Sequence, residues 1–269
     1  MTIVTISDID FNALYKHHKQ QAGRPAKPAS AWDARALALR GKPLESAYTD
    51  AFIERMDFSD ARTLLDVGCG AGNIGVQVAH RLDAVYGMDY SPAMLDVMAH
   101  NAAVRGLKNV HPIQAGWDDD WEAIPVCDIV VASRSTLVED LGDALSKLHN
   151  HARRRVYLSY LTGGFFVDRS IARLLGRDGR AHPDYMYILN ILHTMGVTPR
   201  LDYIDVPGPL AGTENFDDFA QKVTRALGEL DETDCQALQH WYDADAGRAC
   251  RGGALMRWAF IWWETNSYD

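Results

Sequence analysis

The fold is decided by residues 64–75, which read Leu64-Leu65-Asp66-Val67-Gly68-Cys69-Gly70-Ala71-Gly72-Asn73-Ile74-Gly75. A short apolar run leads into a glycine-rich turn, and a helical pattern follows. Glycine lets a ligand come close to the backbone because it has no side chain, and the first N–H groups of a helix are free to donate. The stretch therefore predicts a parallel strand that ends in a ligand-binding turn.

A second informative stretch is Tyr86-Gly87-Met88-Asp89-Tyr90-Ser91-Pro92-Ala93-Met94-Leu95. Asp89 follows the second predicted strand, about twenty residues beyond the first glycines, where a carboxylate can accept hydrogen bonds from both hydroxyls of a ribose. Ser91-Pro92 is a good helix start, since serine can cap and proline suits the first turn. The pair of stretches predicts a ligand that contains a nucleoside.

A dinucleotide is the first alternative, because Gly70-Ala71-Gly72-Asn73-Ile74-Gly75 matches the pattern GxGxxG. Alone, this match is weak. The predicted strand meets its first glycine at Gly68, which gives GxGxG spacing, and Asp66 stands at the strand end. A negative charge there suits an ammonium group better than a pyrophosphate, so the sequence favours a different nucleoside ligand.

Strand and helix patterns alternate from residue 63 onward, which predicts right-handed βαβ crossovers and an α/β fold. Strands are expected at 63–67, 84–88, 110–114, 128–132, 156–160, 201–206 and 255–263, and helices at 73–82, after Ser91, at 138–149 and at 185–195. Pro112 cannot donate to a ladder, so the third strand should lie at a sheet edge. The first sixty residues read as helices, with Ser7 and Ser30 as candidate caps.

LLDVGCGAGNIG followed by GMDYSPAML resembles the first two motifs of class I S-adenosylmethionine-dependent methyltransferases, and CDIVVAS resembles their fourth strand. The resemblance runs from about residue 63 to 140, with looser agreement to 206. It implies a Rossmann-like sheet that is mostly parallel, with seven strands and helices on both faces. It also implies an N-terminal helical cap at 1–60 and a methyltransferase domain at 61–269, with a helical insertion at about 207–252.

The resemblance implies S-adenosylmethionine as cofactor, S-adenosylhomocysteine as product, and a role for each matching residue. Asp66 and the glycine turn hold the methionine end, and Asp89 holds the ribose. Tyr90 and Met94 flank the adenine, and the turn at Gly116-Trp117 contacts its edge. Ser133 faces the sulfonium. The implied cofactor-binding set is Asp66, Gly68, Cys69, Gly70, Gly72, Asp89, Tyr90, Met94, Gly116, Trp117 and Ser133.

The methyl acceptor is expected under a cap built from residues 1–50 and 207–252, which carry aromatic side chains. The candidate pocket residues are Tyr15, Trp32, Arg134 and Tyr160. Arg134, a cation after the fourth strand, could hold an acidic substrate; the alternative is a surface ion pair with Glu139 or Asp140. The sequence shows no diagnostic catalytic residue, and alignment of an activated donor supplies most of the acceleration in such a step.

Composition narrows the partners and the place of action. The net charge is -9 and the pI about 5.5, whereas proteins that grip nucleic acid usually carry a basic face. The cysteines, Cys69, Cys127, Cys235 and Cys250, have no zinc spacing and suit reduced thiols in the cytoplasm, so no metal is expected. No signal peptide or membrane-spanning stretch is recognised.

Methyl transfer to a small-molecule acceptor by direct in-line displacement is the favoured function. The alternatives are a methyltransferase acting on protein or RNA, and a cofactor-binding module without turnover. The sequence leaves open the atom that is methylated, the use of a general base and the oligomeric state.

Overall fold

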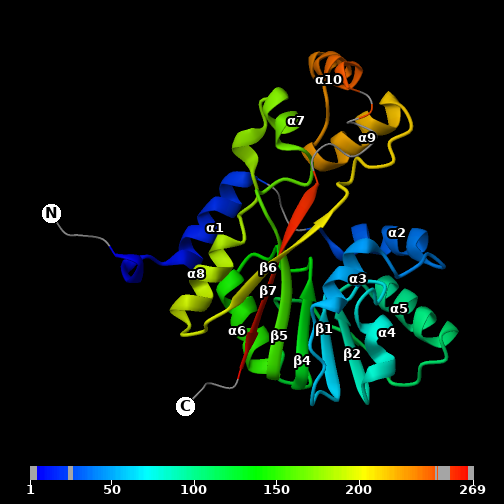
Figure 1. Ribbon diagram of the computed structural model, residues 1–269, viewed down its shortest axis with the longest axis vertical. Helices are drawn as coiled ribbons and strands as arrows, with labels where there is room; N and C mark the ends of the chain where they lie inside the picture. The colour runs from blue at the N-terminus through cyan, green and yellow to red at the C-terminus, as the bar shows by residue number, and fades with distance from the viewer. Residues whose placement is uncertain (1–4, 24–26, 246, 248–254, 266–269) are drawn as a thin grey trace.

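Seven strands form one sheet in the order β3-β2-β1-β4-β5-β7-β6 (Figure 1). The computed structural model describes residues 5–23, 27–245, 247 and 255–265. The strands are β1 (Thr63–Val67), β2 (Ala84–Asp89), β3 (Val110–Gln114), β4 (Cys127–Ser133), β5 (Ala152–Leu161), β6 (Arg200–Val206) and β7 (Met256–Glu264). Each predicted strand is present, with boundaries shifted by a few residues.

The sheet is mixed, which corrects the expectation of a mostly parallel one. Strands β1 to β5 pair in parallel, but β7 runs antiparallel to both β5 and β6. The reason lies in where the chain re-enters the sheet. Met256, the first residue of β7, pairs with Val206, the last residue of β6, so β7 starts at the carboxyl edge and runs backward.

Strand β3 lies at the edge of the sheet, as Pro112 predicts. Its described neighbour is β2, and Pro112 is in register with Gly87. An edge strand has no hydrogen-bonded neighbour on one side, so a proline there can lack its N–H without breaking a ladder hydrogen bond.

Helices cover both faces of the sheet (Figure 1). On one face, α1 (Phe11–Ala22) packs against α6 (Leu141–His151) and α8 (Met186–Thr194). On the other lie α3 (Ala47–Glu54), α4 (Gly75–Val78) and α5 (Pro92–Val104), with α2 (Ala29–Leu39) packed on α5. The helices of the predicted cap are thus distributed over both faces. Short 3₁₀ turns occupy Ile6–Asp8, Ala79–Arg81 and Asp178–Arg180.

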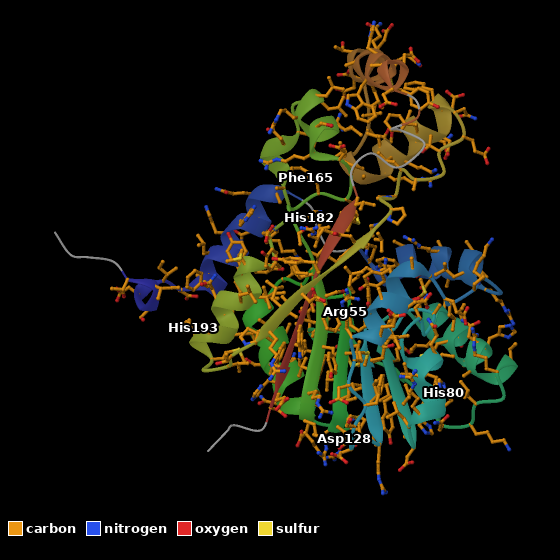
Figure 2. The ribbon with its side chains drawn as sticks, in the orientation of Figure 1. Arg55, His80, Asp128, Phe165, His182 and His193 are labelled. Carbon is orange, nitrogen blue, oxygen red and sulfur yellow. The ribbon has the colours of Figure 1, made fainter. Side chains whose placement is uncertain are left out.

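A helical lobe, formed by α7 (Arg169–Leu174), α9 (Phe216–Leu227) and α10 (Glu232–Ala244), has a core of its own beyond the end of the sheet (Figure 1). Phe219 stacks on Trp241 with ring centroids 5.6 Å apart. Phe165 and His182 lie where this lobe meets the sheet (Figure 2). Helices α9 and α10 fall within the predicted insertion, whose positions 246 and 248–252 lie outside the described residues.

Helix starts show which polar residue caps when several compete. Ser91 caps α5 as predicted, since its Oγ accepts from the Met94 N–H at 3.2 Å. Ser7 does not cap α1, because Asp10 stands directly before the helix and its Oδ1 accepts a hydrogen bond from the Ala13 N–H. Ser30 lies inside α2. The helix predicted over 73–82 is reduced to α4 and a 3₁₀ turn.

Gly75 sets how closely α4 approaches the sheet. A Cβ at this position would lie 2.9 Å from Cγ1 of Val85 and 3.1 Å from Oδ2 of Asp66. Its N–H donates to that Asp66 oxygen at 2.9 Å. A glycine at this place in a strand–turn–helix unit allows close helix–strand packing, so Gly75 serves packing, although the motif offers no dinucleotide site.

Gly75→Ala should therefore destabilise the fold by about 1–3 kcal/mol, the usual cost of overpacking a filled interior. Urea unfolding would measure the loss. Gly179→Ala is the control, because a Cβ there meets nothing within 4 Å. Equal unfolding free energies for the two variants would show that α4 can move away from the sheet without cost.

Candidate active site

The glycine turn between β1 and α4 adopts a backbone conformation that side chains disfavour. Gly68, Gly70 and Gly72 have φ of 67°, 52° and 85°. A Cβ on Gly68 would lie 2.4 Å from Cβ of Ser135, and one on Gly72 would lie 2.4 Å from Cγ2 of Val76. A Cβ on Gly70 would meet nothing within 4 Å. Two glycines therefore fit against the protein, whereas Gly70 faces open space that a ligand can enter.

Asp89 stands at the carboxyl end of β2, directly beside this turn. Its Oδ2 accepts from the Gly70 N–H at 2.9 Å, and its Oδ1 accepts from the Ser91 N–H at 2.9 Å. Burial raises the pKa of the carboxyl, while these two N–H groups act in the opposite direction. Each carboxylate oxygen keeps a lone pair beyond these bonds, so the group is oriented and can still accept from a ligand.

Asp66 lies underneath the turn, on the same edge as Asp89. It is 2% exposed, and its Oδ2 accepts from the Gly75 N–H. Burial raises its pKa to about 7, the Gly75 bond lowers it, and the negative charge of Asp89 raises it further. A cationic ligand group above the turn would relieve this unfavourable burial of charge, which fits the implied contact with an ammonium.

Part of the implied adenine site is closed by α2. Tyr90 is 38% exposed and its hydroxyl donates to the Lys27 carbonyl at 2.9 Å. Met94 is only 3% exposed in a cluster with Ala36 of α2, so it offers little surface to a ligand. Trp32, expected in the acceptor pocket, lies beside Tyr90, whose pKa is raised by burial and by the charge of Asp89 against an opposing effect of Trp32.

Cys69 contributes backbone rather than side chain to the turn. Its Sγ lies 3.4 Å from Sδ of Met98 beneath the turn, and burial raises the pKa of the thiol well above its usual value. Its N–H donates to the Met88 carbonyl at 3.0 Å. The thiol is therefore small filling between β2 and α5, which removes it as a side-chain contact for the cofactor.

The turn after β3 reaches the glycine turn through Trp117. The indole N–H of Trp117 donates to the Ser135 carbonyl at 3.0 Å, and the Gly116 carbonyl accepts from the indole of Trp121 at 3.0 Å. The Gly116 N–H is taken by Asp119 at 2.7 Å. This network fixes the loop from β3 against the segment that follows β4.

The segment after β4 gathers a polar and aromatic cluster with Tyr48 of α3 at its centre. The Tyr48 hydroxyl shares hydrogen bonds with Oγ of Ser133 at 2.8 Å and Oγ of Ser159 at 2.6 Å. Ser159 also accepts from the Arg134 N–H at 3.0 Å. Arg134 has φ of 57°, a strained conformation for a residue with a side chain. Tyr48, which sequence reasoning counted only among the cap aromatics, thus links the cap to the ends of β4 and β5.

The guanidinium of Arg134 lies over the Tyr48 ring, with Cζ 4.0 Å from its centroid, and 5.7 Å from that of Trp258. The side chain keeps exposed surface, yet desolvation lowers its pKa and the positive charge of Arg35 lowers it further, against the opposing effect of Tyr48. The guanidinium therefore combines exposed surface with close contact to the aromatic rings of Tyr48 and Trp258.

The alternative of a surface ion pair for Arg134 is wrong. Glu139 pairs with Lys19, and Asp140 pairs with Lys16, both from α1. Within the described chain no carboxylate forms an ion pair with Arg134.

Tyr15 and Tyr160 belong to the core, which corrects their assignment to the acceptor pocket. Tyr15 is 0% exposed and its hydroxyl donates to the Val138 carbonyl at 2.6 Å. Tyr160 is 1% exposed, and burial raises the pKa of both phenols. Their apolar surroundings on the α1 face, rather than any pocket, account for the aromatic pattern.

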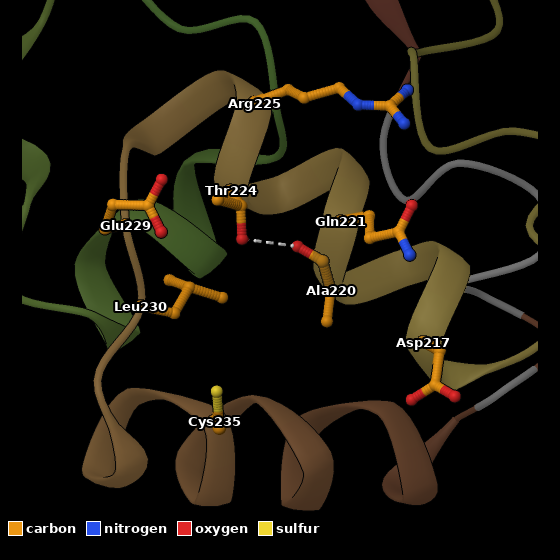
Figure 3. A pocket seen from close by; sticks show the side chains of 8 residues that line it. All are labelled: Asp217, Ala220, Gln221, Thr224, Arg225, Glu229, Leu230 and Cys235. Atoms are coloured by element: carbon orange, nitrogen blue, oxygen red, sulfur yellow. Dashed lines mark hydrogen bonds between the residues drawn. The ribbon is translucent and has the colours of Figure 1, made fainter.

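The helical lobe carries a hollow of about 510 Å³ between α9 and α10 (Figure 3). Its lining residues are Asp217, Ala220, Gln221, Thr224, Arg225, Glu229, Leu230 and Cys235. None of the residues implied for cofactor or acceptor lines it. The oriented carboxylate of Asp89 and the exposed guanidinium of Arg134 lie instead at the carboxyl ends of β2 and β4.

Comparisons with known proteins identify the family of the chain. The family profile described as a methyltransferase domain matches residues 58–164. An uncharacterized protein of Haemophilus influenzae is 34% identical over 268 residues, 98% of this chain and 99% of that protein. The chain belongs to the class I S-adenosylmethionine-dependent methyltransferases.

Solved structures share the fold of this methyltransferase. Coclaurine N-methyltransferase, solved with N-methylheliamine and S-adenosylhomocysteine, matches with a TM-score of 0.53 and 12% identity over 96% of each chain. The YcgJ protein of Bacillus subtilis matches with a TM-score of 0.57 and 16% identity, over 81% of this chain and 98% of that chain. At such low identity these likenesses concern the fold alone.

Among the described residues of the methyltransferase, no group of three or more His, Cys, Asp or Glu side chains is arranged to hold a metal ion. No helix in the same residues has the length and apolar character needed to cross a membrane.

The buried Asp66 gives the methyltransferase a pH-dependent stability. Because its pKa of about 7 lies above the ordinary 3.8, the folded chain binds this proton more tightly than the unfolded chain does. Stability from this group is complete below the ordinary pKa and is lost as the pH rises toward the raised one. The Asn variant has no such proton. Between about pH 5 and pH 8, the free energy of unfolding of Asp66→Asn should therefore rise relative to that of the native chain by on the order of 2 kcal/mol.

Urea unfolding at both pH values, without cofactor, measures this difference. Asp205→Asn is the control, since the ion pair with Arg257 lowers the pKa of Asp205, so its contribution is constant over this range. Parallel pH curves for Asp66→Asn and the native chain would show that Asp66 titrates normally.

Proposed function

We propose that this methyltransferase transfers the methyl group of S-adenosylmethionine to a small-molecule acceptor by direct in-line displacement. The observation that carries the acceptor half is the Tyr48 hydroxyl, which joins α3 to Ser133 and Ser159 at the ends of β4 and β5. A helix fixed at this edge restricts access to the strand ends, which favours a small acceptor over a polymer.

The residues beside the glycine turn fit the cofactor. Gly70 faces open space, and Asp89 keeps acceptor capacity at the end of the neighbouring strand. Ligands of parallel sheets bind beyond the carboxyl ends of the strands, at the switch in strand order. In this sheet the switch lies between β1 and β4, next to which both Asp66 and Arg134 stand.

The cofactor supplies an activated methyl group on a sulfonium. The chain's task is then to align an acceptor with the methyl–sulfur bond and to exclude water. In this proposal Asp89 binds the ribose, Ser133 faces the reacting end, and Tyr48 fixes the wall opposite the turn. A general base is required only for an acceptor that holds a proton at neutral pH.

Labelled cofactor separates this function from its alternatives. The purified chain is incubated with S-adenosylmethionine labelled in the methyl group and with the small-molecule, protein and RNA fractions of a cell extract. We expect label in the small-molecule fraction. Transfer to protein or RNA instead would establish a macromolecular substrate, and binding without transfer to any fraction would establish a module without turnover.

Asp89→Ala should weaken the binding of S-adenosylhomocysteine by about 1.5–3 kcal/mol, the range for hydrogen bonds to a charged group. That loss is roughly tenfold to a hundredfold in affinity, measurable by isothermal titration calorimetry. Asp83→Asn is the matched control, because Asp83 precedes the same strand at its opposite end and pairs only loosely with Arg62 at 3.8 Å. Unchanged affinity in Asp89→Ala would remove Asp89 as the ribose ligand.

A further inference from the structure

We propose that Arg134, together with Arg35 of α2, forms an anion site that holds a carboxylate of the methyl acceptor. This inference rests on the proposed function and specifies its substrate class. It starts from two exposed arginines, Arg134 beside Tyr48 and Arg35 beside Trp32, neither of which forms an ion pair within the described residues.

The plane of the Arg134 guanidinium is fixed while its donors stay free. The Tyr48 ring covers one face at 4.0 Å, and the Arg134 backbone N–H is tied to Ser159. No described protein acceptor takes a hydrogen bond from the guanidinium itself. A planar fork held in one orientation with unused N–H groups is suited to bidentate carboxylate recognition.

Arg35 supplies the second charge from the cap. It lies close enough to Arg134 for its positive charge to oppose that of Arg134, and its own guanidinium lies 5.7 Å from the centroid of the Trp32 ring. Repulsion between two cations is relieved by an anion placed between them. The net charge of the chain is -9, which repels an anion at long range. The attraction for an anion must therefore come from these two arginines at short range.

Trp258 adds a donor to the same cluster. Its ring lies 5.9 Å from that of Tyr48 and 5.7 Å from Cζ of Arg134. It is 5% exposed, and its indole N–H is buried without a hydrogen-bond partner. A buried donor without a partner is costly, and a modest shift of the ring would let it donate to an anion held by Arg134.

A carboxylate at this site could come from the acceptor or from the methionine part of the cofactor. We assign it to the acceptor, because Arg134 is held by Ser159 of β5 and lies beside Trp258 of β7, whereas Asp89 stands at the end of β2. The methionine carboxylate is the competing source, and the binding comparison with 5′-methylthioadenosine separates the two.

Anion-exchange fractions of a small-molecule extract test this assignment. With labelled S-adenosylmethionine, the native chain should label acceptors that the resin retains. Arg134→Gln should lower this transfer at least about tenfold, as expected for loss of a charge-assisted pair, and Arg134→Lys should restore part of it. Arg35→Gln, an exposed helix substitution that leaves the core untouched, should lower it as well.

Arg81→Gln is the matched control. Arg81 also lies over an aromatic ring, with Cζ 5.1 Å from the centroid of Phe58, but it precedes β2 at the opposite edge, next to His80 (Figure 2). The rate of methyl transfer by Arg81→Gln should equal that of the native chain. Label confined to acceptors that the resin does not retain would overturn the proposal.

Binding measurements without methyl transfer separate the two possible sources of the carboxylate, the acceptor and the methionine part of the cofactor. Arg134→Gln should bind S-adenosylhomocysteine and 5′-methylthioadenosine, which lacks the amino-acid part, as the native chain does. If the variant lost only S-adenosylhomocysteine, Arg134 would hold the cofactor's carboxylate, and the acceptor proposal would be overturned while the cofactor half of the proposed function stood.

Benzoate should raise the thermal unfolding midpoint of the native S-adenosylhomocysteine complex more than neutral benzamide does, and equal effects would count against an anion site.

Discussion

The close approach of α4 to β1 is the constraint on which the rest of the site depends. It is possible because Gly75 has no Cβ to meet Val85, and it is fixed by the bond from the Gly75 N–H to Asp66. The turn between β1 and α4 has positive φ at its three glycines, where glycine is the suitable residue. This turn places the Gly70 N–H on Asp89 at the end of β2, so the two strand ends are joined through it.

That contact has an electrostatic cost which a ligand is suited to offset. Asp66 is buried beneath the turn and Asp89 beside it; the negative charge of Asp89 raises the pKa of Asp66, and burial raises the pKa of both carboxyl groups. Two negative charges that share a poorly solvated edge are stabilised by a cation arriving from solvent. The sulfonium and ammonium of the proposed cofactor carry such charge, so the site is arranged for a ligand of the opposite sign from a pyrophosphate.

Sequence reasoning succeeded where backbone chemistry is local and failed where packing decides. The glycine turn, the Ser91 cap and the edge position of Pro112 each follow from what one residue can or cannot do. The reversed direction of β7 depends on where the helical lobe returns the chain, which no local pattern records. Tyr15 and Tyr48 are both cap aromatics in sequence, and both are buried, but only packing brings Tyr48 to Ser133 and Ser159 at the strand ends.

Arg134 shows how the two levels combine. Its place after β4 could be read from the sequence, but whether it was a surface cation depended on which lysines α1 brings to Glu139 and Asp140. Once those acids are taken, the guanidinium has aromatic neighbours and no counter-ion among the described residues. The proposed site then carries negative charge beneath the glycine turn and positive charge beyond β4. A cationic donor and an anionic acceptor would each be drawn to its own side, so the charge distribution would orient the two proposed reactants before any catalytic side chain acts.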